Sequence, residues 1–151
     1  MICNRKVFKD DFPAQIMTTL EEHKKIIKEF LDDINEKIKA NLLAERQKII
    51  GFSSSEAAAN LFALFLHSKR LVEPSYNLNH RFFASKKIAE KTFNFDFANK
   101  EILIELLVKQ EEFRNKLCYG KDKKGEVVYD AVKNLFEIKK LIDDELEKEQ
   151  K

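Results

Sequence analysis

The sequence contains little of what breaks helices or supports a disulfide-stapled fold. Its 151 residues include only 3 glycines and 2 prolines, too few for the many tight turns that an all-β fold needs. The two cysteines, Cys3 and Cys118, have no metal-ligand or redox spacing and indicate no disulfide framework. A net charge of +2 predicts no strong general attraction to nucleic acid. A helical fold is therefore the expectation.

Common catalytic and targeting motifs are missing as well. The sequence has no Gly-rich phosphate loop, no Gly-x-Ser-x-Gly and no His-Glu-x-x-His, so P-loop hydrolases, serine hydrolases and zinc proteases receive no support. No two of its three histidines lie three or four residues apart, so we expect neither a metal nor a cofactor. The first residues lack the apolar core of a signal peptide, and the longest apolar run, 61–66, is too short to cross a bilayer. We expect a cytoplasmic protein without membrane contact.

The residues that are present indicate one folded domain. Hydrophobic residues make up 44% of the chain and charged residues 36%, a balance that excludes a disordered segment. A chain of this length suffices for one hydrophobic core and is too short for two domains of ordinary size. We therefore expect a single domain over 1–151, with its core at about 18–149.

Apolar spacing and capping patterns predict the first two helices. Thr18 and Thr19 stand three residues before a pair of glutamates, a doubled capping box that would start a helix running to about Ile50, where Gly51 would end it. A second capping box at 53–56 would start an Ala-rich, almost uncharged helix that ends before Pro74. Because that helix is apolar on nearly all sides, we expect it at the centre of a bundle or in an interface.

Three further helices are expected at about 80–92, from a cap at Asn99 to Gly120, and at 126–149. The buried side of the fourth would be marked by four apolar residues, Ile102, Leu106, Phe113 and Leu117. Short connections make neighbouring helices antiparallel. The sequence therefore predicts an all-α, up-and-down bundle of about five helices.

Arg114 and Tyr119 are the first candidates for chemistry. Arginine carries a permanent charge and a fork of donors that suits phosphate oxygens, whereas a phenol, with an ordinary pKa of ~10, is a poor general base at neutral pH. The two residues are five positions apart and would share a side only where the helix ends, which Gly120 permits. The alternative is that Arg114 satisfies a carboxylate or helix-end carbonyls and Tyr119 is a half-buried side chain.

His80 is the second candidate, because it lies in a polar stretch with Asn77, Asn79 and Arg81 and histidine titrates in the range useful for catalysis. His67 ends an apolar helix and is interpreted as a hydrogen-bonded core residue. The surrounding segment, 67–91, is locally basic with interleaved aromatic residues. Such a mixture can track phosphates and stack bases, or its aromatic residues can belong to the core with its lysines merely solvated.

Three segments together resemble a known family. Residues 51–72 (GFSSSEAAANLFALFLHSKRLV) are similar to the Ala- and aromatic-rich second helix of HEPN domains (higher eukaryotes and prokaryotes nucleotide-binding). Residues 79–83 (NHRFF) resemble the Thr-His-Lys segment that follows, and 114–120 (RNKLCYG) occupies the place of the Arg-x(4–6)-His signature. The resemblance covers about 18–149 and is closest to small prokaryotic members whose motif ends in Tyr; Cys118 replaces the Asp of that branch.

The resemblance implies a homodimer of helical bundles with its motif arginines facing a shared cleft. Many members are metal-independent ribonuclease toxins restrained by a minimal nucleotidyltransferase, and others bind nucleotides or partners without cutting. Carried over, Arg114 holds phosphate and Asn115 is its polar neighbour, while Tyr119 stands where the nucleases place their catalytic His. His80 and Arg81 are possible contributors.

Three functions follow as alternatives. The leading one is a non-catalytic nucleotide- or RNA-binding or partner module of a toxin–antitoxin-type pair, with Arg114, Asn115, His80 and Arg81 in its binding cleft. The second is a metal-independent endoribonuclease that uses Arg114 with Tyr119 or His80. The third is a purely structural helical interaction protein without a ligand.

Overall fold

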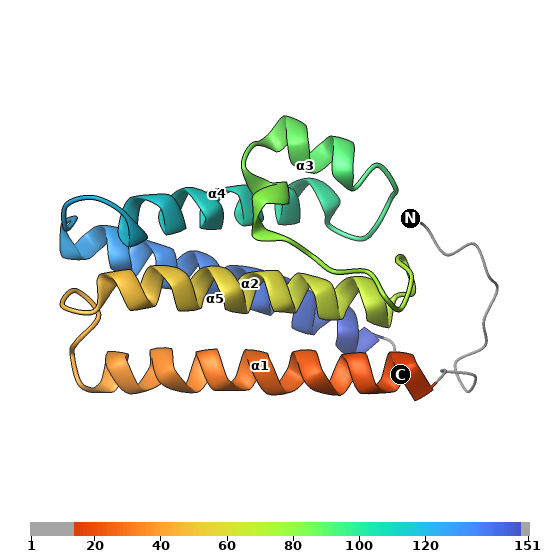
Figure 1. Ribbon diagram of the computed structural model, residues 1–151, viewed down its shortest axis with the longest axis horizontal. Coiled ribbons are helices and arrows are strands. Elements are labelled where there is room, and N and C mark those ends of the chain that lie inside the picture. The colour runs from red at the N-terminus through yellow and green to blue at the C-terminus, as the bar shows by residue number, and fades with distance from the viewer. Residues whose placement is uncertain (1–13, 149–151) are drawn as a thin grey trace.

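The computed structural model describes residues 14–148 of the chain, which form a helical bundle with no strand in that range (Figure 1). The predicted all-α fold is thus confirmed. In order, the elements are α1 (Ala14–Lys39), α2 (Gln47–Ser68), a 3-10 turn η1 (His80–Phe83), α3 (Lys86–Thr92), α4 (Lys100–Cys118) and α5 (Gly125–Glu147).

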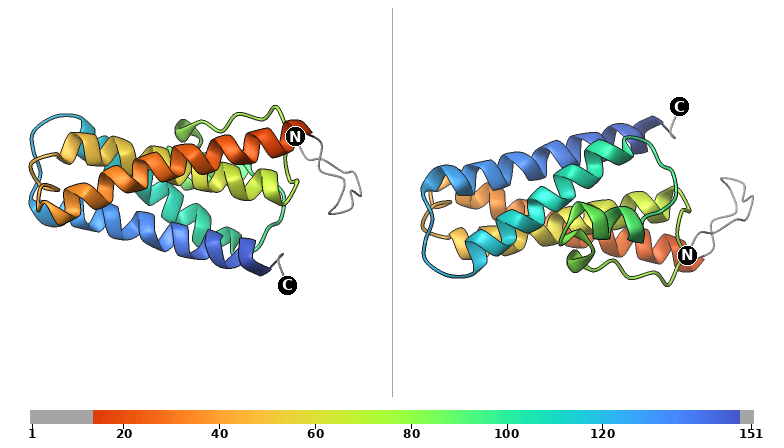
Figure 2. Two further views of the ribbon diagram at one scale, coloured as in Figure 1. Left: turned by 90° about the horizontal axis from the view of Figure 1, so that it is seen from below. Right: turned by 90° about the horizontal axis from the view of Figure 1, so that it is seen from above.

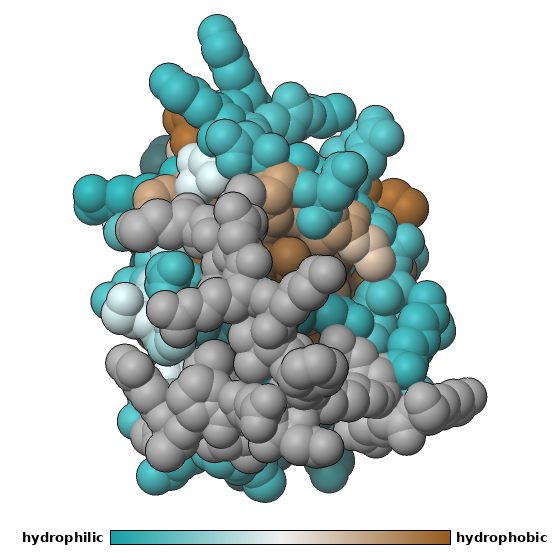
Figure 3. All heavy atoms as spheres, turned by 90° about the vertical axis from the view of Figure 1, so that its right-hand side faces the viewer, coloured by the Kyte–Doolittle hydropathy of each residue, from teal (hydrophilic) through white to brown (hydrophobic). Residues whose placement is uncertain are grey.

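The four long helices run up and down, and α2 lies at their centre (Figures 1 and 2). Helix α2 packs against α1, α4 and α5, whereas α1 packs closely against α2 alone among the described helices. The segment with η1 and α3 lies on the outside of the bundle, against α4 and α2. Seen from the end where α1 begins, the described side chains are mostly hydrophilic, with a small apolar area between them (Figure 3).

The central place of α2 agrees with its composition. Its most apolar window is long enough to cross a membrane, the only such window in the described helices, but 78% of it is buried inside the bundle. A core helix has this property, because every side of it meets another element. Phe62 and Phe65 lie fully buried on α2 and contact the rings of Phe83, Phe93 and Phe97 from the outer segment.

The boundary predicted between the first two helices is wrong. Helix α1 ends at Lys39, where Asn41 takes a left-handed conformation (φ 57°) and the Leu42 N–H donates to the Lys37 carbonyl at 2.9 Å. This is a Schellman motif in which asparagine takes the left-handed position that glycine usually occupies. Gly51 lies inside α2 and ends no helix. A Cβ at Gly51 would lie 2.7 Å from the Leu117 Cβ, so the missing side chain permits the close approach of α2 and α4.

The predicted caps are also wrong in part. Thr18 and Thr19 lie inside α1, and the serines of 53–55 are buried within α2. The helix expected at 80–92 is divided into η1 and α3, because the Ser85 hydroxyl accepts from the Ile88 N–H at 3.1 Å and starts a new helix. Asn99 does precede α4, but its side chain donates to Glu145 (3.2 Å) and does not cap the helix.

The buried side of α4 differs from the predicted one. Phe113 and Leu117 are buried as expected and Leu106 is partly buried, but Ile102 is 52% exposed. The buried face also carries Leu103, Ile104 and Leu107 and three polar residues, Gln110, Glu111 and Arg114. These polar residues lie beside η1 and α2, where Glu111 contacts His80 and Arg114 contacts Glu56.

Candidate functional site

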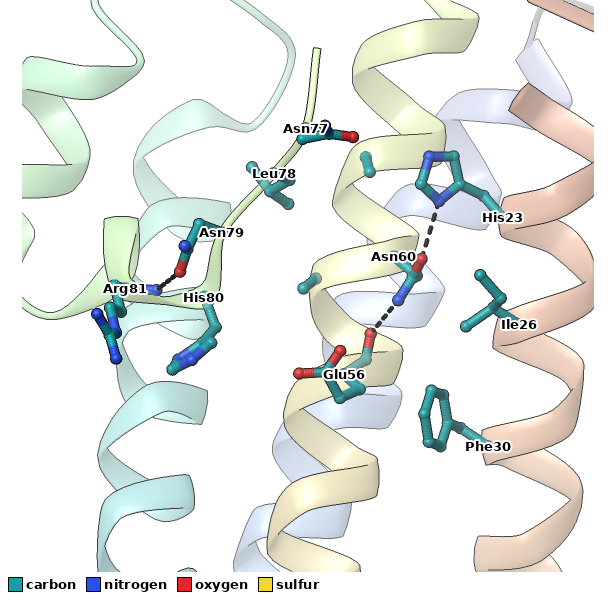
Figure 4. A pocket seen from close by; sticks show the side chains of 12 residues that line it. His23, Ile26, Phe30, Glu56, Asn60, Asn77, Leu78, Asn79, His80 and Arg81 are labelled. Carbon is teal, nitrogen blue, oxygen red and sulfur yellow. Dashed lines mark hydrogen bonds between the residues drawn. The ribbon is translucent and has the colours of Figure 1, made fainter. Parts of the chain in front are cut away.

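An open groove of about 740 Å³ lies between α1, α2 and the extended segment that leads into η1 (Figure 4). Helix α1 forms one wall, α2 the floor, and residues 77–81 the other wall. Its apolar lining consists of Ile26, Phe30, Ala59, Ala63 and Leu78, and its polar lining of His23, Glu56, Asn60, Asn77, Asn79, His80 and Arg81. The groove thus combines an apolar strip with hydrogen-bonding groups.

Local hydrogen bonding and core packing fix the wall that carries His80 and Arg81. The Asn79 side chain accepts a hydrogen bond from the Arg81 backbone N–H at 2.9 Å and so caps η1. Phe83, only 3% exposed, packs its ring against Phe62 of α2 at 5.8 Å between ring centroids. These two contacts hold a short turn at a fixed place beside the groove.

His80 is paired with a buried carboxylate. Its Nδ1 lies 2.9 Å and 3.1 Å from the two carboxylate oxygens of Glu111, which is 6% exposed. Because an ionised carboxylate only accepts, the Nδ1 carries the proton and donates it. The other ring nitrogen, Nε2, is therefore the one that neutral His80 offers as an acceptor. A carboxylate that orients an imidazole in this way is the arrangement used in acid–base catalysis.

Arg114 lies on α4 one turn after Glu111, on the same side of that helix, and it faces α2. Its Nη1 is 2.9 Å from Glu56 Oε1 and 3.3 Å from the Ser55 hydroxyl, and its guanidinium lies over the Phe52 ring at 5.1 Å. Only 11% of its side chain is exposed. The groove is lined by the Glu56 carboxylate and not by Arg114 itself, so Glu56 lies between the arginine and any occupant.

The structure therefore brings some of the expected residues together and leaves others apart. His80 and Arg81 line the groove, and Arg114 lies behind its floor. Tyr119 is 63% exposed in extended backbone after the end of α4, and Asn115 is exposed on the outer side of that helix. Neither has a described contact with Arg114. Arg114 forms an ion pair with Glu56, as the alternative interpretation of this arginine predicts.

Sequence reasoning missed three residues of the site. The position of Glu111 could have been inferred from the sequence, because it precedes Arg114 by three residues and so lies on the same side of the helix. Glu56 belongs to the predicted capping box at 53–56, and its contact with Arg114 spans 58 residues of sequence. His23 of α1 contacts Asn60 across 37 residues (Nδ1 to Oδ1, 2.8 Å). No local pattern reports such long-range contacts.

His23, which lines the groove, stacks on a second, buried histidine. The rings of His23 and His67 lie 5.6 Å apart between centroids, at an interplanar angle of 23°. His67 is 1% exposed, and its Nε2 donates to the Tyr76 carbonyl at 3.2 Å, since a carbonyl can only accept. The interpretation of His67 as a hydrogen-bonded core residue is confirmed. Its bond also ties the start of the 76–81 segment to α2.

The burial of His67 predicts a pH dependence of stability. Desolvation, with a smaller contribution from nearby His23, lowers the pKa of His67 below its ordinary value, although the bond to Tyr76 opposes this. Below about pH 6.5 the unfolded chain binds a proton that the folded protein resists. The contribution of His67 is thus complete above that pH and is lost as the pH falls. Urea unfolding at pH 7.5 and 5.5 should show a smaller pH difference for His67→Gln; an equal difference would contradict the assignment.

Comparisons with family models, with curated proteins and with solved structures found no match to this chain. Within residues 14–148, no three His, Cys, Asp or Glu side chains are grouped in a way that could hold a metal ion. The groove and the charged cluster beneath it are the features of the described residues that indicate a function.

Proposed function

We propose that the groove binds a nucleotide or a stretch of single-stranded RNA, and that the protein is an HEPN-like binding module. One observation carries the proposal: an apolar strip with an aromatic ring, Phe30, shares the groove with Arg81 and His80. Proteins that bind single-stranded nucleic acid combine these elements, because bases stack on aromatic rings and cations hold the phosphates. The groove is also large enough for a nucleotide, since ligand pockets span roughly 300–1,000 Å³.

Arg81 is the cation that we expect to contact phosphate first. It has no ion-pair partner in the part of the chain that the structure describes, and it is an exposed residue that lines the groove. The charge of Arg114 is balanced by Glu56 at 2.9 Å. In this arrangement Arg114 holds Glu56 and the groove floor in place. Arg114 would attract phosphate only if its ion pair with Glu56 opened.

The Arg81→Ala variant is expected to weaken RNA binding on the order of tenfold. The salt dependence of binding should also become less steep by about one counterion, because one phosphate contact is lost. The measurement is fluorescence anisotropy of a labelled single-stranded oligoribonucleotide at several salt concentrations. The matched control is Arg46→Ala, which removes an equal charge from the exposed N-cap position of α2, where the side chain makes no capping bond. Equal losses in both variants would contradict a role for the groove.

A second function is favoured by the His80–Glu111 pair, which resembles the acid–base pairs of metal-free hydrolases. Here Nε2 of His80 would take the proton of an RNA 2′-hydroxyl while the 2′-oxygen attacks phosphorus. The bond to the 5′-oxygen breaks, and that oxygen takes a proton from water. This endoribonuclease would cut RNA in EDTA, would lose activity in His80→Ala and Arg114→Ala, and would keep it in Tyr119→Phe. Absence of cutting by the wild type would leave the binding module.

The proposed module also includes a homodimer and a nucleotidyltransferase-type partner in the cytoplasm, which are supported by the resemblance alone. Light scattering of the purified protein tests the dimer, and co-purification with a co-expressed nucleotidyltransferase tests the partner. A monomer that binds neither nucleotide nor RNA would instead be the purely structural helical protein.

A further inference from the structure

We infer that the groove prefers nucleobases that present an exocyclic amine, such as adenine and cytosine, over bases that present a carbonyl oxygen at the same position. The inference rests on the proposed nucleotide binding and names the class of base that this site selects. It follows from a chain of hydrogen bonds that fixes which atom of His23 faces the groove.

The chain begins at a backbone carbonyl. Nδ2 of Asn60 lies 2.8 Å from the carbonyl oxygen of Glu56, one helical turn earlier on α2. A carbonyl oxygen can only accept, so the amide nitrogen of Asn60 must face it and donate. The orientation of the amide group is thereby fixed, and its oxygen, Oδ1, must point toward α1.

The same logic fixes the tautomer of His23. Its Nδ1 lies 2.8 Å from Asn60 Oδ1, and since that oxygen only accepts, Nδ1 must carry the hydrogen. In the neutral imidazole Nε2 is then an acceptor with a free lone pair. In the part of the chain that the structure describes, Nε2 of His23 has no hydrogen-bond partner, and it lies on the side of the ring toward Asn77, across the groove (Figure 4).

The shape of the groove gives a base an orientation. His23 and Asn77 lie toward one end, and Arg81 and His80 lie toward the other (Figure 4). The apolar part of the lining includes Ile26 of α1 and Leu78 of the opposite wall, together with the small residues Ala59 and Ala63 of α2. A nucleotide whose phosphate contacts Arg81 would therefore lay its base in the apolar part and direct the outer edge of that base at His23.

An exocyclic amine at that edge donates to Nε2, whereas a carbonyl oxygen faces the lone pair and leaves both groups unpaired. The loss of one such hydrogen bond changes affinity on the order of five- to tenfold. AMP and inosine 5′-monophosphate carry the amine and the carbonyl oxygen at the same ring position. CMP and UMP form a second pair of the same kind.

The test is calorimetric titration of the four nucleotides at pH 8, where ordinary imidazoles are neutral. The wild type should bind AMP about five- to tenfold more tightly than inosine 5′-monophosphate, and CMP more tightly than UMP. Asn60→Ala releases His23 from its fixed tautomer and should reduce this ratio while the imidazole is still present. His23→Phe should abolish the ratio. Arg81→Ala should weaken binding of both members of a pair and leave their ratio unchanged.

The outcomes separate this inference from the function on which it rests. Absence of binding by all four nucleotides and by oligoribonucleotides would overturn the proposed function itself. Binding without preference, or with preference for the carbonyl-bearing bases, would overturn only the role of His23. A ratio that persists in both His23→Phe and Asn60→Ala, with unchanged circular dichroism, would place base selection elsewhere in the groove.

Discussion

The Phe62→Ala variant is expected to lower the free energy of unfolding by about 3–5 kcal/mol, the range found when a buried aromatic residue is truncated. Phe62 is fully buried on the central helix, and its ring centroid lies 5.2–6.1 Å from those of Phe93, Phe97, Phe83 and Phe65. Removing the ring opens a cavity among rigid neighbours that cannot close around it. Urea unfolding followed by circular dichroism measures the loss.

The same variant should weaken binding in the groove. Phe62 anchors Phe83 and Phe93, which hold η1 and its neighbours against α2, and η1 carries His80 and Arg81. The matched control is Phe136→Ala on α5, whose side chain is 36% exposed, and which should lose far less stability and no binding. Equal stability losses in the two variants would show that the aromatic cluster is not the anchor of this segment.

The sequence was sufficient for the fold class and for the central position of α2, because both follow from composition. A run of alanines and apolar residues with almost no charge favours a position inside a bundle, where every side of the helix is covered. The helix boundaries failed where a local pattern had two possible meanings. Gly51 can end a helix or allow two helices to touch, and the contact with Leu117 decides between them. That contact joins residues far apart in sequence, so no local pattern could report it.

The site was predicted in part for the same reason. Arg114 is a candidate because of its spacing to Tyr119 and the resemblance, and His80 because of its residue type and polar surroundings, all of which can be read from local sequence. Their carboxylate partners were not predicted, because Glu56 and Glu111 meet them across 58 and 31 residues. Whether an arginine faces solvent, a ligand or a carboxylate depends on those partners. The ion pair with Glu56 therefore explains why Arg114 lies behind the groove floor.

The Glu56→Gln variant is expected to lower the free energy of unfolding by roughly 2–3 kcal/mol. Breaking a fully buried ion pair by removing one partner costs about 3–5 kcal/mol, and the 29% exposure of the Glu56 side chain reduces this through solvent screening. The glutamine amide oxygen could still accept a hydrogen bond from Arg114, but no carboxylate would compensate the arginine charge, beside which only the Ser55 hydroxyl and the Phe52 ring remain. The control is Glu112→Gln, which removes the same charge from an exposed α4 residue that has no ion pair with any residue of 14–148.

The same substitution should raise the affinity of the groove for anions. With Glu56 neutral, the floor no longer presents a carboxylate, and the charge of Arg114 is uncompensated behind it. Inorganic phosphate should therefore raise the melting temperature of Glu56→Gln more than that of the wild type or of Glu112→Gln, because a ligand that binds only the folded state stabilises it. Equal phosphate effects in all three proteins would mean that Arg114 is a structural cation without access to ligands. A selective effect would make Glu56 the residue that sets how strongly this groove attracts phosphate.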